Sequence, residues 1–145
     1  MAAFRHALEL GADGVEFDVH TTSDGALVVF HDELLHRTSS GSWSPCQHDL
    51  GCIRSLDAGS WFDPRFEGEP IPLLEEVLGL PTVEFELELK ASSKKFATDV
   101  VETVLQFGAL RRTEFTSWNF PMLLWLKECW PDARIGLFSL PDGTG

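Results

Sequence analysis

Strand-type and helix-type segments alternate over the second half of the chain, and this alternation constrains the fold more than any other feature. Residues 83–90, 114–118 and 134–140 are predicted strands, because their apolar residues alternate with polar ones or run together. Between them, residues 93–108 and 119–131 carry helical patterns, each with a capping residue at its start and Gly or Pro at its end. Strands that alternate with helices of this length are typical of parallel βα units. The sequence therefore predicts an α/β fold.

The first half of the chain contains a predicted hairpin. A helix near 2–10 precedes a strand at 14–20, and a second strand follows at 26–32. Asp24 and Gly25 between the two strands are a strong signal for a tight two-residue turn. We therefore expect two antiparallel neighbours ahead of the parallel units.

The segment between the hairpin and the βα units adds no second domain. Residues 33–70 show no sustained period and predict loops with short helical turns, and residues 72–79 predict a short helix. The sequence contains no linker, repeat or low-complexity tract, so the prediction is one domain over 1–145.

One face of the hairpin gathers side chains that could carry chemistry. If the turn has two residues, Asp18 lies directly opposite His31 with Cβ atoms about 5 Å apart, and Glu16 projects from the same face. A register that differs by one residue would turn His31 to the opposite face. Clustered carboxylates take up a proton or a cation, and Mg²⁺ and Ca²⁺ prefer such oxygen ligands. The alternative is an ordinary solvated face of an antiparallel hairpin.

A second set of charges follows one face of the strand at 83–90. Glu84, Glu86, Glu88 and Lys90 alternate with apolar residues, and like charges along one strand face are unfavourable unless they are solvated or bound to cations. An exposed strand face is one reading. The other is a site at the carboxyl end of a parallel strand, where Glu88 would bind a metal ion and Lys90 would contact phosphate.

The remaining candidates are weaker. His20, His36 and His48 lie in polar segments and are predicted to be ordinary surface histidines. Trp61 either lines a substrate pocket or fixes its loop to the core, which is the commoner use of an aromatic residue.

Charge and composition exclude several partners. The net charge is -12, with 23 acidic and 11 basic residues, so the field of the chain repels nucleic acid and anionic membranes. No apolar run approaches the roughly 20 residues of a membrane span. The 3 cysteines, an odd number without dense spacing, favour a reducing compartment, and we expect a cytoplasmic protein.

The hairpin sequence resembles the signature of the glycerophosphodiester phosphodiesterase family. In that family a strand with E-x-D leads through a D-G turn to a strand that ends in H-D, and an R-T and a glycine follow. The matching residues are Glu16, Asp18, Asp24-Gly25, His31-Asp32, Arg37-Thr38 and Gly41. Segments similar to later parts of the family are SLDAGSWF at 55–62, GEPIPLLEEVL at 68–78, ELK at 88–90, TSW at 116–118 and RIGLF at 134–138. The resemblance extends from about Ala3 to Leu140.

This resemblance implies a TIM barrel of the PLC-like phosphodiesterase type. One divalent cation, Mg²⁺ or Ca²⁺, would be held by Glu16, Asp18 and Glu88. His31 would be one of two histidines that act as general acid and base, and Lys90 would neutralise the phosphate. Lys90 and Trp61 are the expected substrate contacts. The implied reaction is hydrolysis of a glycerophosphodiester to glycerol 3-phosphate and an alcohol.

The chain also departs from the family pattern. The H-R-G and E-N-T segments, with the second catalytic histidine, would precede Met1, and the chain supplies at most five of the eight barrel strands. We therefore expect a domain that is incomplete at both ends and that has little activity or stability alone. Glu86 stands where the family more often has a neutral residue, and it either adds charge near the metal or pairs with a cation lower in the barrel.

Two alternative functions remain open at this point. Within the same fold, the parent protein could be a lysophospholipase D that acts on lysophospholipids. Outside enzymes, the chain could be a truncated, non-catalytic isoform. For either enzyme, the expected partner is a small-molecule substrate, a glycerophosphodiester or a lysophospholipid.

Overall fold

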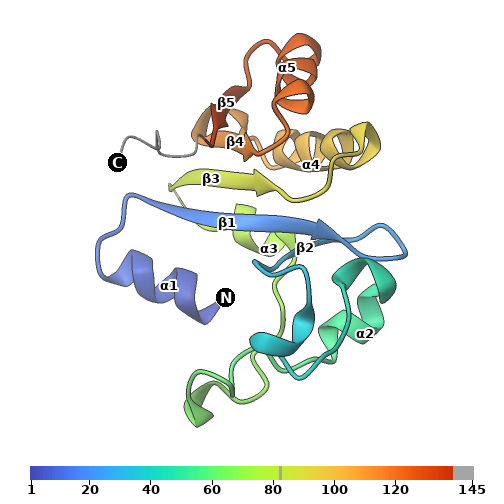
Figure 1. Ribbon diagram of the computed structural model, residues 1–145. Coiled ribbons are helices and arrows are strands. Elements are labelled where there is room, and N and C mark those ends of the chain that lie inside the picture. Colours follow the sequence, from blue (N-terminus) through green and yellow to red (C-terminus); the bar gives the residue numbers. More distant parts are fainter. Residues whose placement is uncertain (82, 139–145) are drawn as a thin grey trace, which may run out of the picture.

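A computed structural model describes residues 1–81 and 83–138 of the chain, and its centre is one mixed β-sheet (Figure 1). Five strands lie in the spatial order β2-β1-β3-β4-β5. Their bounds are β1 (Gly14–Thr21), β2 (Leu27–Val29), β3 (Glu84–Leu89), β4 (Thr113–Ser117) and β5 (Arg134–Leu137). The pairs β1–β3, β3–β4 and β4–β5 are parallel, and only β1–β2 is antiparallel. The predicted α/β class is confirmed.

Five α-helices accompany the sheet within residues 1–81 and 83–138. Their bounds are α1 (Ala2–Glu9), α2 (Leu50–Arg54), α3 (Leu74–Leu78), α4 (Lys94–Gln106) and α5 (Phe120–Cys129). Short 3-10 turns at Leu35–Arg37, Pro45–Gln47 and Pro64–Phe66 lie in the long loop, residues 33–70. A fourth at Leu110–Arg112 precedes β4. None of the helices in the described part of the chain is long and apolar enough to cross a membrane.

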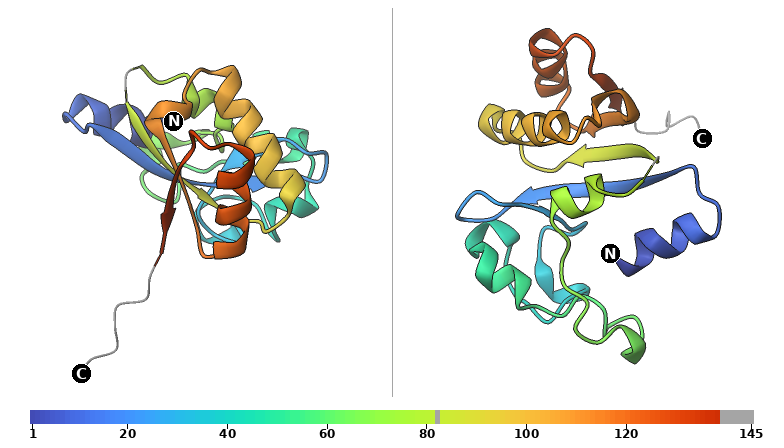
Figure 2. Two further views of the ribbon diagram at one scale, coloured as in Figure 1. Left: turned by 90° about the horizontal axis from the view of Figure 1, so that it is seen from above. Right: turned by 180° about the vertical axis from the view of Figure 1, so that it is seen from behind.

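The caps that the sequence suggested define where the two crossover helices begin. The Ser93 side chain accepts a hydrogen bond from the backbone N–H of Phe96, and the Asn119 side chain accepts one from Met122. These bonds satisfy N–H groups that have no partner within the helix. The two helices connect parallel strands and lie on the same side of the sheet (Figure 2).

The main core lies between the sheet and its helices. Val15, Phe17 and Val19 of β1 point into it, and Phe85 and Leu87 of β3 pack against them. The period of two along each strand therefore leaves Glu16, Asp18 and Glu88 on the other face of the sheet.

The hairpin register differs by one residue from the predicted one. Val19 pairs with Val29, so Asp18 lies beside Phe30, whose N–H donates to the Asp18 carbonyl at 3.0 Å. The turn contains three residues rather than two, because the Thr22 N–H donates to the Ala26 carbonyl at 2.9 Å. The prediction that Asp18 faces His31 directly is therefore wrong.

The side chain of Thr22 explains the longer turn. Its Oγ1 accepts from the Ala26 N–H at 2.8 Å and donates to Asp24 Oδ1 at 2.5 Å, so Thr22 rather than Ser23 pairs with Ala26. Gly25 has φ +90°, the left-handed conformation that three-residue hairpin loops place at this position.

Two other predicted boundaries shift. The strand predicted at 26–32 shortens to β2, and the strand predicted at 134–140 corresponds to β5, with residues 139 and 140 outside the described residues. Helix α3 and the turns between residues 33 and 70 lie where the sequence placed them.

Candidate active site

Three carboxylates meet on the face of the sheet opposite the main core. Glu16 and Asp18 come from β1, Glu88 comes from β3, and the parallel register places Asp18 beside Glu88. Each of the three offers a carboxylate oxygen, and these oxygens all lie within 4.8 Å of one another. Glu88 is next to last in β3, so the cluster lies toward the carboxyl ends of the parallel strands. This is the end at which α/β barrels build their active sites.

Burial and mutual repulsion disfavour ionisation of this cluster. Asp18 is 5% exposed and Glu88 8%, whereas Glu16 is exposed. Partial burial of its carboxylate raises the pKa of Glu16, and the charges of Asp18, Glu86 and Glu88 raise it further. Burial also raises the pKa of Glu88, and Asp18 adds to the rise while Lys90 opposes it. A cation at this point would relieve the repulsion.

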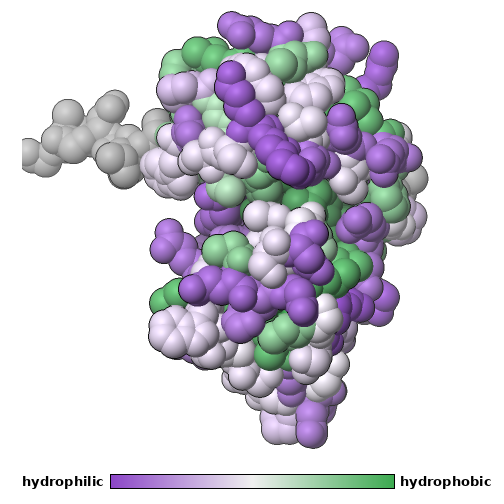
Figure 3. Space-filling view, turned by 90° about the vertical axis from the view of Figure 1, so that its right-hand side faces the viewer, coloured by the Kyte–Doolittle hydropathy of each residue, from purple (hydrophilic) through white to green (hydrophobic). Residues whose placement is uncertain are grey.

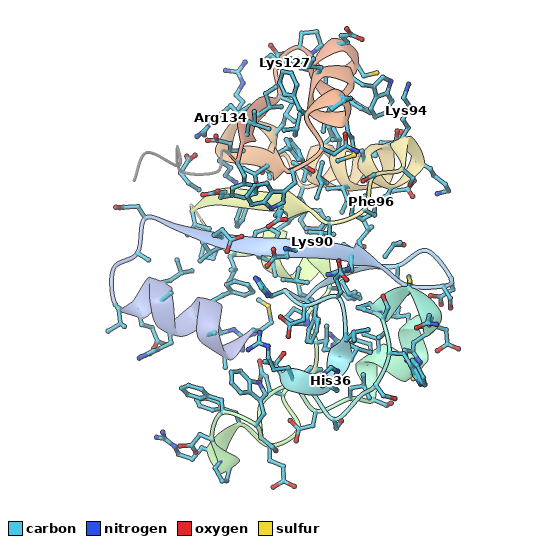
Figure 4. All side chains as sticks on the ribbon, viewed as in Figure 1. His36, Lys90, Lys94, Phe96, Lys127 and Arg134 are labelled. Atoms are coloured by element: carbon cyan, nitrogen blue, oxygen red, sulfur yellow. The ribbon has the colours of Figure 1, made fainter. Side chains whose placement is uncertain are left out.

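Lys90 supplies one such positive charge. Its Nζ lies 2.9 Å from Asp18 Oδ1 and 3.0 Å from Glu88 Oε2. Burial lowers the pKa of Lys90, but the two carboxylates outweigh this effect and hold it above its ordinary value. Lys90 is therefore a protonated ammonium group at neutral pH. Figure 4 shows Lys90 beside the sheet, well separated from His36 in the long loop.

The donor set fits a hard divalent ion. Ligand oxygens at the roughly 2.0–2.6 Å typical of Mg²⁺ and Ca²⁺ lie no more than about 4–5 Å apart across the ion, which matches the spread of the cluster. Asp18 Oδ1 is buried and has no hydrogen bond of good geometry among the described residues, although Lys90 is close. A buried carboxylate oxygen in this situation is a suitable ligand for a cation.

An open hollow of about 610 Å³ adjoins the cluster. It brings together His31, Glu88 and Lys90, three of the residues that the sequence singled out. Its remaining lining residues are Glu33, Leu89, Ser92, Ser117, Trp118, Asn119 and Pro121. Figure 3 shows the side of the molecule toward which the carboxyl ends of β1 and β3 point, where hydrophilic side chains lie between smaller hydrophobic areas.

His31 reaches this hollow although the hairpin register was predicted incorrectly. The antiparallel ladder ends at Val29, and the chain bends after Phe30, so strand alternation no longer decides where His31 points. The side chain is 72% exposed, and its Nδ1 lies 2.7 Å from Asp32 Oδ1. His31 therefore lines the same hollow as Glu88 and Lys90, and the predicted strand pairing does not account for this position.

The other acids of β3 behave as the solvated-face reading predicted. Glu84 is exposed and pairs with Arg134 at 2.6 Å, and Arg134 also contacts Glu114 at 3.3 Å. Glu86 is exposed as well. Of the two alternatives for Glu86, the structure supports added negative charge near the cluster, because Glu86 raises the pKa of Glu16. Glu16 itself borders a second hollow, of about 320 Å³, with these residues.

His20 differs from its predicted role as a surface histidine. It is half-buried on the same face of β1 as Asp18, and its Nε2 is buried. Burial lowers its pKa, so the ring is disposed to be neutral.

The aromatic residue beside the hollow is Trp118 rather than Trp61. Trp118 directly follows β4, is 61% exposed and stacks on Phe138 with ring centroids 5.2 Å apart. Trp61 is not among the residues that line the hollow, and its indole N–H donates to the Ala58 carbonyl at 3.0 Å. The rule that sites lie at the carboxyl ends of barrel strands would have drawn attention to Trp118 in the sequence.

Known proteins are similar to this chain in sequence. The model of the glycerophosphoryl diester phosphodiesterase family matches residues 1–121. A glycerophosphodiester phosphodiesterase of Caldanaerobacter subterraneus subsp. tengcongensis is 36% identical over 143 residues, which are 94% of this chain and 59% of that protein. One from Bacillus altitudinis is 33% identical, over 97% of this chain and 60% of that protein.

Solved structures agree. The glycerophosphodiester phosphodiesterase of Agrobacterium tumefaciens superposes with a TM-score of 0.82 at 36% identity, over 92% of this chain and 58% of that one. An Oleispira antarctica phosphodiesterase in complex with the product sn-glycerol-3-phosphate superposes with a TM-score of 0.86 at 30% identity, over 98% of this chain and 61% of that one.

The matched proteins are longer than this chain, which spans about three fifths of their length. The five-stranded sheet therefore corresponds to part of their TIM-barrel-type fold, as the sequence predicted. Since the family model covers most of the chain and the solved structures carry the same fold, the chain belongs to the glycerophosphoryl diester phosphodiesterase family.

Proposed function

We propose that the protein that carries this chain hydrolyses glycerophosphodiesters to glycerol 3-phosphate and an alcohol such as choline or ethanolamine. The observation that carries the proposal is the cluster of Glu16, Asp18 and Glu88 beside Lys90, at the edge of the hollow that His31 lines. The Oleispira antarctica relative, whose structure holds sn-glycerol-3-phosphate, supports the same product class.

Glu16, Asp18 and Glu88 would hold one divalent cation, Mg²⁺ or Ca²⁺. When bound, the cation supplies positive charge that polarises the phosphodiester and stabilises the charge that develops on its oxygens. The raised pKa values of Glu16 and Glu88 are consistent with this role, because both carboxylates gain from a nearby positive charge.

Lys90 would contact the phosphate of the substrate. Its ammonium group is protonated and lies within the hollow, and its two carboxylate neighbours fix its position. A preorganised positive charge of this kind lowers the barrier because it does not need to reorganise as the transition state forms.

His31 would exchange a proton with the reacting oxygens. Asp32 occupies its Nδ1, so Nε2 is the nitrogen that remains for the substrate or for water. An imidazole with an ordinary pKa of about 6.5 can give or take a proton near neutral pH in general. A second histidine would complete the acid–base pair, as the family resemblance implies.

The direct test is hydrolysis of glycerophosphocholine with and without EDTA. We expect release of glycerol 3-phosphate that EDTA stops and that added Mg²⁺ or Ca²⁺ restores. Turnover of lysophosphatidylcholine but not of glycerophosphocholine would favour the lysophospholipase D alternative. Absence of turnover with both substrates in the cation-loaded protein would overturn the proposal. The same assay on the 145-residue chain alone tests the separate expectation of little activity.

A further inference from the structure

Three side chains form a connected line that ends at the hollow. His31 Nδ1 lies 2.7 Å from Asp32 Oδ1. Arg37 donates two hydrogen bonds to the same carboxylate, from Nε to Oδ2 at 2.5 Å and from Nη2 to Oδ1 at 2.7 Å. The His-Asp and Arg-Thr positions were singled out in the sequence. The reaction described above uses Asp32 only as the partner of His31 Nδ1 and gives Arg37 no role.

The chemistry of this line fixes where the protons are. Arg37 first, and His31 second, donate hydrogen bonds that hold the pKa of Asp32 well below its usual range, so the carboxylate is ionised and can only accept. His31 must therefore carry a proton on Nδ1 in order to make its 2.7 Å contact. In the neutral ring this leaves the lone pair on Nε2, and in the charged ring it leaves an Nε2–H donor.

The backbone around Arg37 is well anchored. Arg37 ends the 3-10 turn Leu35–Arg37, and Leu35 is fully buried. The Leu35 N–H donates to the Trp43 carbonyl at 2.8 Å, and the Ser39 hydroxyl donates to the Leu35 carbonyl at 2.7 Å. Asp32 is itself only 18% exposed, although Arg37 is 59% exposed. The turn therefore brings Arg37 back to Asp32 in a defined position.

The Arg37–Asp32 ion pair could be an ordinary surface pair, and such pairs usually contribute little to stability. A second arginine–aspartate pair of the same chain shows what distinguishes it. Arg65 and Asp63 form this second pair, and Arg65 Nε lies 3.0 Å from Asp63 Oδ1 in the long loop. No histidine nitrogen contacts Asp63 among the described hydrogen bonds, and neither residue lines the hollow. The pair at Arg37 differs because its carboxylate also holds a histidine that does line the hollow.

We propose that Asp32 and Arg37 are positioning residues that hold His31 in the tautomer with its proton on Nδ1 and direct Nε2 to the substrate. Asp32 contacts the imidazole, and Arg37 acts through Asp32 by fixing the orientation of the carboxylate. The proposal rests on the proposed function in one respect, namely that His31 exchanges protons with the substrate.

The tautomer can be measured without any activity. Long-range ¹H–¹⁵N NMR correlations of the histidine rings distinguish Nδ1–H from Nε2–H, and His31→Gln identifies the signals of His31. We expect the Nδ1–H form in the wild-type protein above the pH at which the ring becomes neutral. Asp32→Ala should give the mixture typical of a free imidazole, and Arg37→Gln should shift the ratio part of the way. Arg65→Gln, which breaks the comparison pair, should change nothing.

Kinetics with glycerophosphocholine supply the second readout. General acid–base catalysis commonly contributes about 10²–10⁴-fold, so Asp32→Ala should lower kcat by up to that factor with KM near the wild-type value. Arg37→Gln should lower kcat by a smaller factor than Asp32→Ala, because Arg37 acts on His31 only through Asp32. Arg65→Gln should leave both parameters unchanged.

The two readouts separate the possible failures. A wild-type Nε2–H tautomer, or a tautomer that Asp32→Ala leaves unchanged, would overturn the positioning role whatever the activity. A rise in KM with unchanged kcat would overturn it as well, because the pair would then serve substrate binding. If the tautomer behaves as expected but no diester is hydrolysed, the positioning of His31 stands and the proposed function fails.

Discussion

Asp18 and Glu88 are direct lateral partners in the register of the parallel strands β1 and β3. Their carboxylates belong to segments far apart in the sequence, yet both are buried and both contact the ammonium group of Lys90. Removal of water makes this contact between like charges costly unless a cation balances it. A variant that removes one of the two carboxylates should therefore bind a divalent cation more weakly.

Glu88→Gln should weaken the binding of Mg²⁺ and Ca²⁺ by at least about tenfold, since even the loss of a hydrogen-bond partner of a metal ligand commonly costs that much. Calorimetric titration of the protein with each ion measures the effect. Glu84→Gln is the matched control, because Glu84 is on the same strand but is exposed and pairs with Arg134. Equal affinity in the wild type and Glu88→Gln would contradict the site.

Glu16→Ala and Glu88→Ala should each abolish hydrolysis by the protein that carries this chain, while the far-ultraviolet circular dichroism stays close to that of the wild type. The reason is that each variant removes a proposed cation ligand from the face of the sheet opposite the main core and leaves that core unchanged. If both variants kept their activity, the assignment of the metal site would have to be withdrawn.

Lys90→Met should separate catalysis from cation binding. The ammonium group competes with a cation for Asp18 and Glu88, so its loss should leave Mg²⁺ affinity unchanged or higher. Hydrolysis should nevertheless fall by about 10²–10³-fold, the usual effect of removing one preorganised group that stabilises the transition state. Steady-state kinetics and calorimetry on the same preparation test both expectations.

The control for Lys90→Met is Lys95→Met, which removes an exposed lysine paired with Asp99 on α4. This variant should change neither quantity. A Lys90→Met protein with wild-type turnover would show that Lys90 only balances the carboxylates.

Trp118→Ala should raise KM for glycerophosphocholine by about 2- to 5-fold, because a contact between an exposed aromatic face and a quaternary ammonium group commonly contributes about 0.5–1 kcal/mol. Trp61→Ala is a matched comparison, since both indoles are more than half exposed but only Trp118 lines the hollow. Steady-state kinetics would decide between them. A larger effect from Trp61→Ala would restore the sequence-based expectation for Trp61 and remove the one for Trp118.

Asp32→Asn should have a stability effect that depends on pH. The pKa of Asp32 in the folded state lies below its ordinary value of 3.8. A carboxylate of this kind stabilises the folded state above its unfolded pKa, and the contribution is lost as the pH falls through the folded pKa. We expect Asp32→Asn to lower the free energy of unfolding by up to about 1 kcal/mol near neutral pH, a small value because Arg37 is exposed.

Urea unfolding of the wild type and Asp32→Asn at several pH values measures this dependence. The difference between the two proteins should shrink progressively below about pH 3.9. A difference that stays constant from neutral pH to pH 3 would show that the effect does not come from the charge of Asp32.

Much of the candidate site was predictable because its residues lie on regular strands. The period of two places Glu16 and Asp18 on one face of β1 and turns Val15, Phe17 and Val19 into the core, whatever the partner strands are. In the same way, Ser93 and Asn119 cap α4 and α5 through hydrogen bonds to residues three positions ahead. Such relationships are local, so the sequence is sufficient to infer them.

The positions of His31 and Trp118 were harder to infer because both lie just beyond the end of a strand. His31 follows the last paired residue of β2, where the backbone bends and the period of two no longer applies. The hydrogen bond from the Ala26 N–H to Thr22 Oγ1 accompanies a turn of three residues, and with this turn Asp18 no longer pairs with His31. Trp61 and Trp118 are both exposed and both pack on a phenylalanine ring, and the one sequence feature that distinguishes Trp118 is its place directly after a strand.

The sequence by itself determined the α/β class, the crossover helices and the face of each strand that carries the acids, because these depend on periodicity and on contacts within a few residues. Only the tertiary structure decided that Asp18 lies beside Glu88 and that Lys90 reaches both. The physical reason is that alternation fixes the face on which a side chain lies but not its partner. The β1–β3 register joins two segments that the long loop and α3 separate in the sequence, so local periodicity cannot determine it.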